Sequence, residues 1–208
     1  MLISIEELIY YLKLHNITFN GVLHVGAHEC EELDFYNKLD IKNEDIIWIE
    51  AIPNKVIEAQ QRGILNVYNE LITNIDNEET VFYISNNVQS SSVLELYIHL
   101  EEHPTVEYVD KIKLNSITID TFYNKYNLDA SKYTLWNFDI QGAELLALKG
   151  AINSIQYVKA IYIEVNEKEL YKNCCLIKDI DDFLHEYNFK RVLTKMTTHG
   201  WGDALYIR

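Results

Sequence analysis

The chain has 208 residues, of which 48% are hydrophobic and 24% charged, and its formal net charge is −14. This length and apolar content favour one α/β domain with a buried core over a disordered or fibrous chain. The acidic excess disfavours nucleic acid and anionic membranes as partners, because both repel a negatively charged surface. No apolar run approaches the ~20 residues of a membrane span.

The cysteines and the amino-terminal residues indicate the cellular compartment of the protein. Cys30, Cys174 and Cys175 are odd in number and two are adjacent, so they do not form a disulfide framework and fit a reducing compartment. The amino-terminal segment lacks the basic region of a signal peptide. We therefore expect a cytoplasmic protein, in the host cytoplasm if the gene is viral.

Helix and strand patterns alternate along the chain. Ser4 and Glu7 form a capping box for an amphipathic helix within residues 1–20, and the core is expected over 21–208 as part of a single domain. Strands are predicted at 21–25, 45–50, 65–68, 134–138, 160–165, 190–194 and 203–207, with 80–84 as an extra edge strand. Helices are predicted at 31–39, 53–62, 93–100, 143–148 and 180–187. Residues 117–126 are predicted as a strand end that runs into a helix capped by Asp120.

This alternation predicts an α/β fold with a mostly parallel sheet and helices on both of its faces. The last two predicted strands are separated by only about ten residues, which is too short for a parallel crossover. The final strand is therefore expected to run antiparallel.

The turn after the first strand is one candidate binding site. Its segment Gly26-Ala-His-Glu-Cys30 contains a single glycine, whereas a dinucleotide loop needs several so that a pyrophosphate can lie against bare backbone. Glu50 ends the second strand, where a carboxylate can accept both hydroxyls of a ribose. Ribose recognition without pyrophosphate recognition indicates a nucleoside ligand such as S-adenosylmethionine. The alternative is an ordinary turn at Gly26 and a solvated strand end at Glu50.

Several segments resemble the FkbM-type methyltransferases, a branch of the class I S-adenosylmethionine-dependent fold. They follow the family order from about residue 21 to the end, and the most specific is the D-I-x-G-x-E-x-x-x-L-x-G pattern that begins at Asp139. The matching segments are VGAHE (25–29), WIEAIPN (48–54), SSS (90–92), NSITID (115–120), FDIQGAELLALKGA (138–151), YIEVN (162–166) and GDALYI (202–207).

The resemblance implies a Rossmann-like, seven-stranded sheet and methyl transfer from S-adenosylmethionine, with S-adenosylhomocysteine as product. It also implies an oxygen acceptor, usually on a sugar or natural product. The implied cofactor-binding residues are Gly26, Ala27, His28, Glu50, Ala51, Ile52, Ser91, Asp139 and Gln141. Two positions depart from the family pattern: Cys30 replaces a second loop glycine, and Gln141 replaces an acidic residue found in many members.

Asp139 and Glu164 are the candidate catalytic carboxylates. They end the fourth and fifth main strands, which are neighbours in this fold, so both should face one crevice. Two nearby carboxylates repel each other, which raises a pKa and makes one of them a candidate base for a hydroxyl. A divalent cation is compatible with such a pair but is not expected. The alternatives are a helix cap for Asp139 and a lysine ion pair for Glu164, and Glu144 is interpreted as structural.

The loop 197–203 precedes the last strand and should overhang the acceptor side of the site. His199 is a candidate base there, and Trp201 offers a flat surface for a sugar ring. The alternative is a glycine-rich turn with an exposed histidine. His99 and His103 are four residues apart, a spacing that can bind a metal ion on one face of a helix. Pro104 follows at once and no third ligand is evident, so we interpret the two histidines as part of a solvated face.

The leading hypothesis is an S-adenosylmethionine-dependent O-methyltransferase that acts on a hydroxyl of a sugar, glycan or related small molecule. The competing hypotheses are a nucleotide-sugar or NAD-binding oxidoreductase and a non-catalytic cofactor-binding module. The expected partner is the acceptor alone, without nucleic acid or membrane, and a homodimer is compatible with the sequence.

Overall fold

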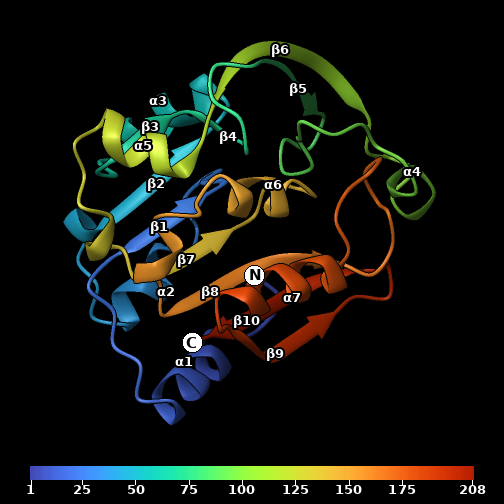
Figure 1. Cartoon of the computed structure of the whole chain (residues 1–208). Coiled ribbons are helices and arrows are strands. Elements are labelled where there is room, and N and C mark those ends of the chain that lie inside the picture. Colours follow the sequence, from blue (N-terminus) through green and yellow to red (C-terminus); the bar gives the residue numbers. More distant parts are fainter.

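The computed structural model describes residues 1–208, and a seven-stranded sheet runs through its centre (Figure 1). The strand order is β3-β2-β1-β7-β8-β10-β9. Neighbours from β3 to β8 are parallel, and β10 is antiparallel to both β8 and β9. The predicted sheet with an antiparallel last strand is thereby confirmed. The strands are β1 (Val22–Val25), β2 (Ile46–Glu50), β3 (Val67–Asn69), β7 (Leu135–Phe138), β8 (Ala160–Asn166), β9 (Lys190–Met196) and β10 (Trp201–Ile207).

Helices cover both faces of this sheet, because successive strand residues point to opposite sides and both sides are apolar. Val22 faces α1, α2 and α3, whereas Leu23 faces α5, α6 and α7. No helix has the length and apolar composition needed to cross a bilayer. The helices are α1 (Ile5–Leu14), α2 (Leu33–Lys38), α3 (Pro53–Gln61), α4 (His99–Glu102), α5 (Ile119–Lys125), α6 (Glu144–Lys149) and α7 (Ile177–Glu186), with short 3-10 turns at Asn43–Asp45, Ala130–Lys132 and Ile155–Tyr157.

A second, three-stranded sheet consists of β4 (Leu71–Ile72), β6 (Tyr108–Ile117) and β5 (Glu79–Ser85), in the order β4-β6-β5. The long β6 arches over the top of the molecule in Figure 1. A strand at 80–84 was predicted, but as an edge of the main sheet, and that placement is wrong. Only the end of β6, at Ile117, was predicted. The rest was missed because most of its side chains are exposed and the strand is held by pairing with β5 rather than by burial.

Two local expectations between the sheets are wrong. The helix predicted at 93–100 is misplaced, because only His99 and Leu100 are helical, at the start of α4, while Leu96 pairs with the distant Tyr171 through an isolated bridge. Asp120 does not cap α5. Thr118 does so, its hydroxyl accepting from the Thr121 N–H at 3.1 Å, while Asp120 accepts from the backbone N–H groups of Asn153 and Ser154.

A buried polar network joins β1, β7 and α2 beneath the main sheet. His24 is 1% exposed, and its Nδ1 lies 2.8 Å from the Tyr36 hydroxyl. Asn137 donates to the same hydroxyl at 2.7 Å, which leaves the Tyr36 proton free to be donated to His24. Burial lowers the pKa of His24 to about 4, so the imidazole is neutral in the folded chain at pH 7.

The buried histidine predicts a specific dependence of stability on pH. Because the folded pKa of His24 is about 4 against an ordinary 6.5, the unfolded chain takes up a proton between these values and the folded chain does not. The contribution of His24 to the free energy of unfolding is therefore present above pH 6.5 and falls as the pH drops, by at most about 1.4 kcal/mol per pH unit.

We expect the stability gap between the wild-type chain and His24→Gln to narrow by roughly 1–2 kcal/mol from pH 7 to pH 5. Urea unfolding at both pH values measures it, with His185→Gln, at an exposed histidine, as the matched control. A gap that stays constant over this range would show that His24 is not held neutral by the fold.

Candidate functional site

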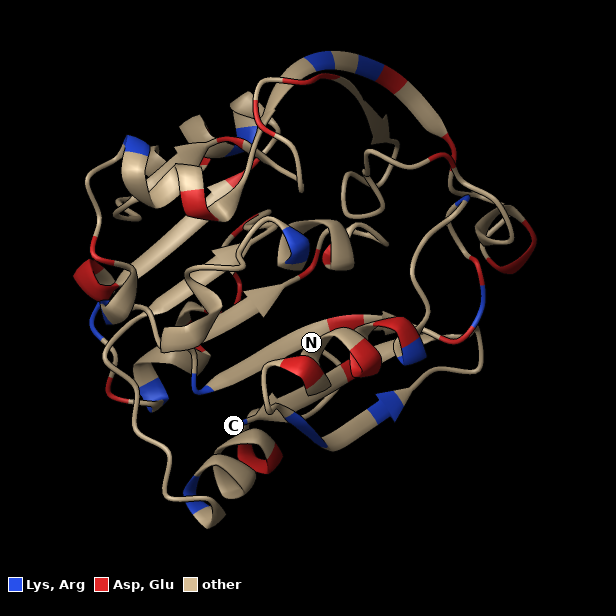
Figure 2. Cartoon of the chain, in the orientation of Figure 1, with Lys and Arg blue, Asp and Glu red and all other residues tan.

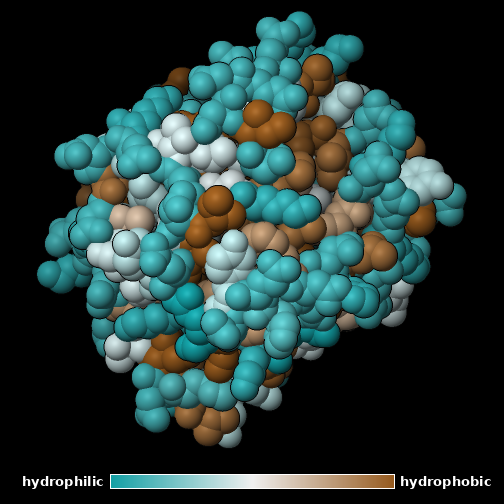
Figure 3. Space-filling model, in the orientation of Figure 1, coloured by the Kyte–Doolittle hydropathy of each residue, from teal (hydrophilic) through white to brown (hydrophobic).

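The centre of the main sheet opens into a cavity at the point where the chain reverses its direction of travel across the sheet. After β1 the chain runs outward to β2 and β3, and it then returns to place β7 on the other side of β1. Ligands of open α/β sheets bind outside the strand ends at such a switch point. The cavity has a volume of about 510 Å³, within the range of small-molecule sites. Apolar residues gather in the centre of the face shown in Figure 3, below the β5–β6 ribbon, amid a mostly hydrophilic surface.

Gly26 controls the close approach of the two central strand ends. Its φ is +91°, and a β-carbon at this position would lie 1.9 Å from the carbonyl oxygen of Asp139. Any side chain would push these backbones apart, so the position requires glycine. The N–H groups of Gly26 and Ala27 both donate to the carbonyl of Ile49, which ties the turn to β2. Ala27 itself is buried beneath the turn and does not line the cavity.

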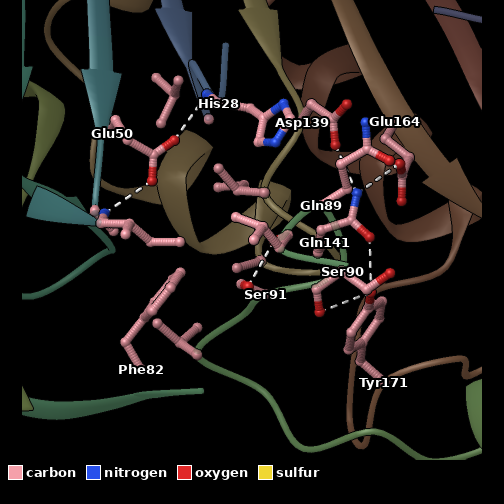
Figure 4. A pocket seen from close by; sticks show the side chains of 18 of the residues that line it. His28, Glu50, Phe82, Gln89, Ser90, Ser91, Asp139, Gln141, Glu164 and Tyr171 are labelled. Carbon is pink, nitrogen blue, oxygen red and sulfur yellow. Dashed lines mark hydrogen bonds between the residues drawn. The ribbon is translucent and has the colours of Figure 1, made fainter. Parts of the chain in front are cut away.

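Glu50 lies at the cavity wall with its carboxylate already partly engaged (Figure 4). One oxygen accepts from the His28 N–H and the other from the Ile52 N–H, each at 2.8 Å. A carboxylate has about four acceptor sites, so two remain for a ligand. Burial raises the pKa of Glu50, and the two backbone hydrogen bonds oppose this effect. Ala51 and Ile52 also line the cavity.

The remainder of the first turn is shaped by backbone conformation. The side chain of His28 lines the cavity and places Nδ1 2.8 Å from Glu31 Oε1, and this hydrogen bond raises the pKa of His28. Cys30 has a φ of +58°, in the left-handed region that glycine favours, which explains why the family pattern has a glycine there. The thiol is buried, so the substitution adds a side chain beneath the turn.

Asp139 and Glu164 are brought together as predicted, and Gln141 links them (Figure 4). The Gln141 amide nitrogen donates to Asp139 Oδ1 at 2.6 Å and to Glu164 Oε2 at 3.0 Å. Its amide oxygen accepts from the Tyr171 hydroxyl at 2.6 Å. All polar atoms of this amide are therefore engaged, which fixes its orientation.

The two carboxyl groups are shifted toward the protonated form. Burial is the main cause of the raised pKa of Asp139 and of Glu164, and the charge of Asp139 raises the pKa of Glu164 further. Asp139 has surface open to the cavity, whereas Glu164 is 7% exposed, so Asp139 is the more accessible of the pair. A carboxylate with a raised pKa is a stronger base once it is ionised.

Asp203 is a third carboxylate that the sequence analysis did not identify. It pairs in register with Glu164 across β8 and β10, it lines the cavity, and its charge also raises the pKa of Glu164. It accepts from the Tyr162 hydroxyl and from the Leu2 N–H. The antiparallel pairing of the last strand was the signal that could have found it.

Glu144 is structural, as its position indicated. It is fully buried, and its Oε1 accepts from the N–H groups of Ile140 and Gly142, which fixes the turn after β7. Burial raises its pKa to about 7.

Trp201 lies at the cavity, whereas His199, predicted to lie beside it, does not. Trp201 lines the cavity, half-buried, beside the apolar cluster of Leu170 and Tyr171. His199 is not among the lining residues. Its Nδ1 lies 3.0 Å from Glu102 Oε2, and its side chain is 44% exposed. The structure therefore brings Trp201 to the cavity but directs His199 toward the surface.

The polar wall opposite the sheet comes from residues 85–106. Ser91 lines the cavity, and its hydroxyl accepts from the Ser85 N–H at 3.0 Å. His99 is only 6% exposed and also lines the cavity, so the interpretation of a solvated face is wrong for it. The segment packs on the chain around Tyr171, a contact that no local pattern reveals. No group of three or more His, Cys, Asp or Glu residues is arranged to hold a metal ion.

Comparison with known proteins identifies a family. The model of the methyltransferase FkbM domain matches residues 24–191. No curated protein is significantly similar to the chain in sequence.

Solved structures share the fold at low sequence identity. A protein of the NADB-Rossmann superfamily from Streptococcus agalactiae is 10% identical with a TM-score of 0.50, covering 100% of this chain and 69% of that one. Streptococcus pneumoniae Sp1610, a candidate tRNA (m1A22) methyltransferase, is 11% identical with a TM-score of 0.48, covering 99% and 70%. The magnesium protoporphyrin IX methyltransferase of Synechocystis, with bound S-adenosylmethionine, is 10% identical with a TM-score of 0.46, covering 98% and 77%. At these identities the similarity concerns the fold alone.

Proposed function

The chain belongs to the FkbM methyltransferase family, and from this premise we propose that it methylates a hydroxyl group of a sugar, glycan or related small molecule. The methyl donor is S-adenosylmethionine, which leaves as S-adenosylhomocysteine. The observation that carries the proposal is one cavity that contains a strand-end carboxylate suited to a ribose, Glu50, and a linked carboxylate pair, Asp139 and Glu164.

The residues around Glu50 fit the nucleoside part of the donor. Two acceptor sites of the Glu50 carboxylate remain for the ribose hydroxyls. Ile52, Ile72 and Phe82 provide an apolar wall nearby, against which a flat base can pack. S-adenosylmethionine has a net positive charge, and the many carboxylates around the cavity favour such a ligand.

The residues around Asp139 fit proton transfer to a carboxylate. When bound, the cofactor supplies a methyl group on a positively charged sulfur. The chain contributes alignment of the acceptor and removal of its proton. Asp139 would accept the hydroxyl proton as the oxygen–methyl bond forms, while Gln141, itself hydrogen-bonded to Glu164 and Tyr171, holds the Asp139 carboxylate in place. The same displacement would break the carbon–sulfur bond of the bound donor, which would leave as the neutral thioether S-adenosylhomocysteine, with the acceptor proton on Asp139.

The competing hypotheses lose support for separate reasons. An oxidoreductase that binds a dinucleotide needs bare backbone for a pyrophosphate, and the first turn has Gly26 alone. A non-catalytic module does not need Asp139 and Glu164 at the cavity, held together by Gln141. The family match favours methyl transfer over both.

Glu50→Ala should weaken donor binding. The variant loses the hydrogen bonds between a charged group and the ribose, which are worth about 1.5–3 kcal/mol. Titration calorimetry with S-adenosylhomocysteine measures the change, and Glu79→Ala, at an exposed strand residue, is the control. Equal affinity of the wild-type chain and Glu50→Ala would contradict the assignment, provided the melting temperatures agree.

Asp139→Asn should impair turnover rather than folding. Asparagine has the same shape but cannot take a proton, so kcat should fall about a hundredfold, as when a general base is lost. The melting temperature should stay within a few degrees, because the Asp139 side chain opens onto the cavity rather than the core. Full activity, or an unfolded variant, would show that Asp139 has a different role. Asp182→Asn on α7 is the control.

Trp201→Ala should raise the acceptor KM and leave donor affinity unchanged, because Trp201 lies on the β10 side of the cavity, away from Glu50 on β2. The acceptor is the best substrate from a screen of neutral monosaccharides and methyl glycosides, and donor affinity is measured by calorimetry. Trp201→Phe keeps an aromatic surface and should retain most of the binding. A loss of several kcal/mol of stability with an unchanged acceptor KM would place Trp201 in the core instead.

A further inference from the structure

The cavity wall is strongly acidic and lacks cationic side chains. The lining residues include seven carboxylates and neither lysine nor arginine. The amino group of Met1 lies close enough to offset part of the charge of Glu32 and Asp139. The whole chain has 32 acidic and 18 basic residues, and the charged residues occur on most of its helices and strands (Figure 2). The seven are Glu31, Glu32, Glu50, Glu70, Asp139, Glu164 and Asp203.

The carboxylates near the proposed acceptor position lie on one side of the cavity. Glu50 is on β2, whereas Glu164 and Asp203 are on β8 and β10, together with Trp201. Three strand intervals separate β2 from β8, which is roughly 14 Å at ~4.8 Å for each interval. The donor and the acceptor therefore occupy opposite ends of the cavity, and the acceptor end has Glu164 and Asp203 at its floor.

His99 is an unpartnered polar group at the acceptor end. The residue lines the cavity while only 6% of its surface is exposed, and its Nδ1 is buried without a hydrogen-bond partner. Its ring lies 5.3 Å from that of Tyr171 and 4.9 Å from that of His103, centroid to centroid. Buried polar groups in native proteins are normally satisfied, so an unpartnered one at a cavity wall indicates a group that a ligand completes.

The two histidines at the acceptor end, His99 and His103, do not compensate for the negative wall. Burial lowers the pKa of His99 to about 4, and the neighbouring His103 adds to this effect. Burial and the charge of His199 also lower the pKa of His103. At pH 7 His99 is therefore a neutral hydrogen-bonding group, which suits a hydroxyl and offers no charge to a phosphate or carboxylate.

We propose that the acceptor end of the cavity selects an electrically neutral polyhydroxyl compound, with His99 hydrogen-bonded to one of its hydroxyls, and rejects acceptors that carry a phosphate or carboxylate. This inference rests on the proposed function. An anionic group here would lie against the carboxylate of Asp203, beside Glu164, and no lysine or arginine side chain lines the cavity to pair with it. Contact between like charges is strongly unfavourable. A neutral glycoside avoids this repulsion, and its apolar CH face packs on Trp201.

Matched acceptors test the charge selection. Methyl glycosides of common hexoses are compared with the 6-phosphate and the uronic acid of the same hexose, and release of S-adenosylhomocysteine is measured. We expect kcat/KM for each neutral compound to exceed that of its anionic partners by at least about tenfold, as expected for like-charge repulsion. An anionic compound methylated as well as its neutral partner would overturn the inference and leave the proposed function intact.

A failure of the proposed function looks different. If calorimetry shows that S-adenosylmethionine binds but no compound of the panel is methylated, the sugar acceptor is wrong and the inference falls with it. If S-adenosylmethionine does not bind, the assignment of the donor half fails as well.

Two substitutions test the role of His99. His99→Phe keeps a flat ring without hydrogen bonding and should raise the KM of the neutral acceptor about tenfold, the worth of a lost hydrogen bond of ordinary strength. His99→Gln restores hydrogen bonding and should stay within about threefold of the wild-type chain. Donor affinity should be unchanged in both, and His185→Phe, at an exposed position, is the control. Equal KM values for all four proteins would overturn the assignment of His99.

Discussion

The site depends on the close approach of two chain segments at the centre of the sheet, where the backbone of Gly26 meets the carbonyl of Asp139. Without a side chain at Gly26, the ends of β1 and β7 can lie together, and the turn can hydrogen-bond to the end of β2. This contact sets Glu50 on one side of the switch point and Asp139 on the other. A ligand that reaches from Glu50 to Asp139 therefore passes over the turn at Gly26. A pyrophosphate would need further bare backbone in this turn, but a ligand without one needs only the single glycine.

Gln141 explains how two neighbouring carboxyl groups coexist at the cavity. Asp139 and Glu164 repel each other, and burial makes their ionised forms costlier still. A carboxylate at position 141 would add a third charge and could not donate to either neighbour. The amide adds no charge and donates to both, while Tyr171 satisfies its oxygen. The departure from the acidic residue of many family members thus has a physical role, since it orients the pair without adding to its repulsion.

The elements that were predicted correctly from the sequence share one property. Each is a short segment in which apolar residues follow one another because nearly every side chain is buried. β2 and β8 are buried at every residue, so the acidic Glu50 at the end of β2 and Glu164 near the end of β8 stand out, although β8 continues to Asn166, beyond the predicted strand end. The same reasoning placed Glu50, Asp139 and Glu164 at one edge. It failed for β6, whose side chains are mostly exposed, and for residues 93–100, which are held by pairing with Tyr171 far along the chain. His99 and Tyr171 reach the cavity through such distant contacts, and no local pattern marks them.

The correctly predicted residues and the missed ones belong to different ends of the cavity. The proposed donor end consists of strand ends and the first turn of the main sheet, and the continuous burial of these strands also determines the fold. The acceptor end adds residues from the 85–106 segment and from the loop after β8, which the main sheet does not constrain. Acceptor selection can therefore change by substitutions in those segments while β1, β2 and β7 keep the donor site unchanged. In the proposed acceptor end of this chain, Glu164 and Asp203 form an acidic wall without lysine or arginine, and the neutral His99 offers a hydrogen bond. Under the proposed acceptor selection, the charge of the acceptor discriminates between compounds in addition to their shape, because repulsion by a buried carboxylate acts before close contact is made.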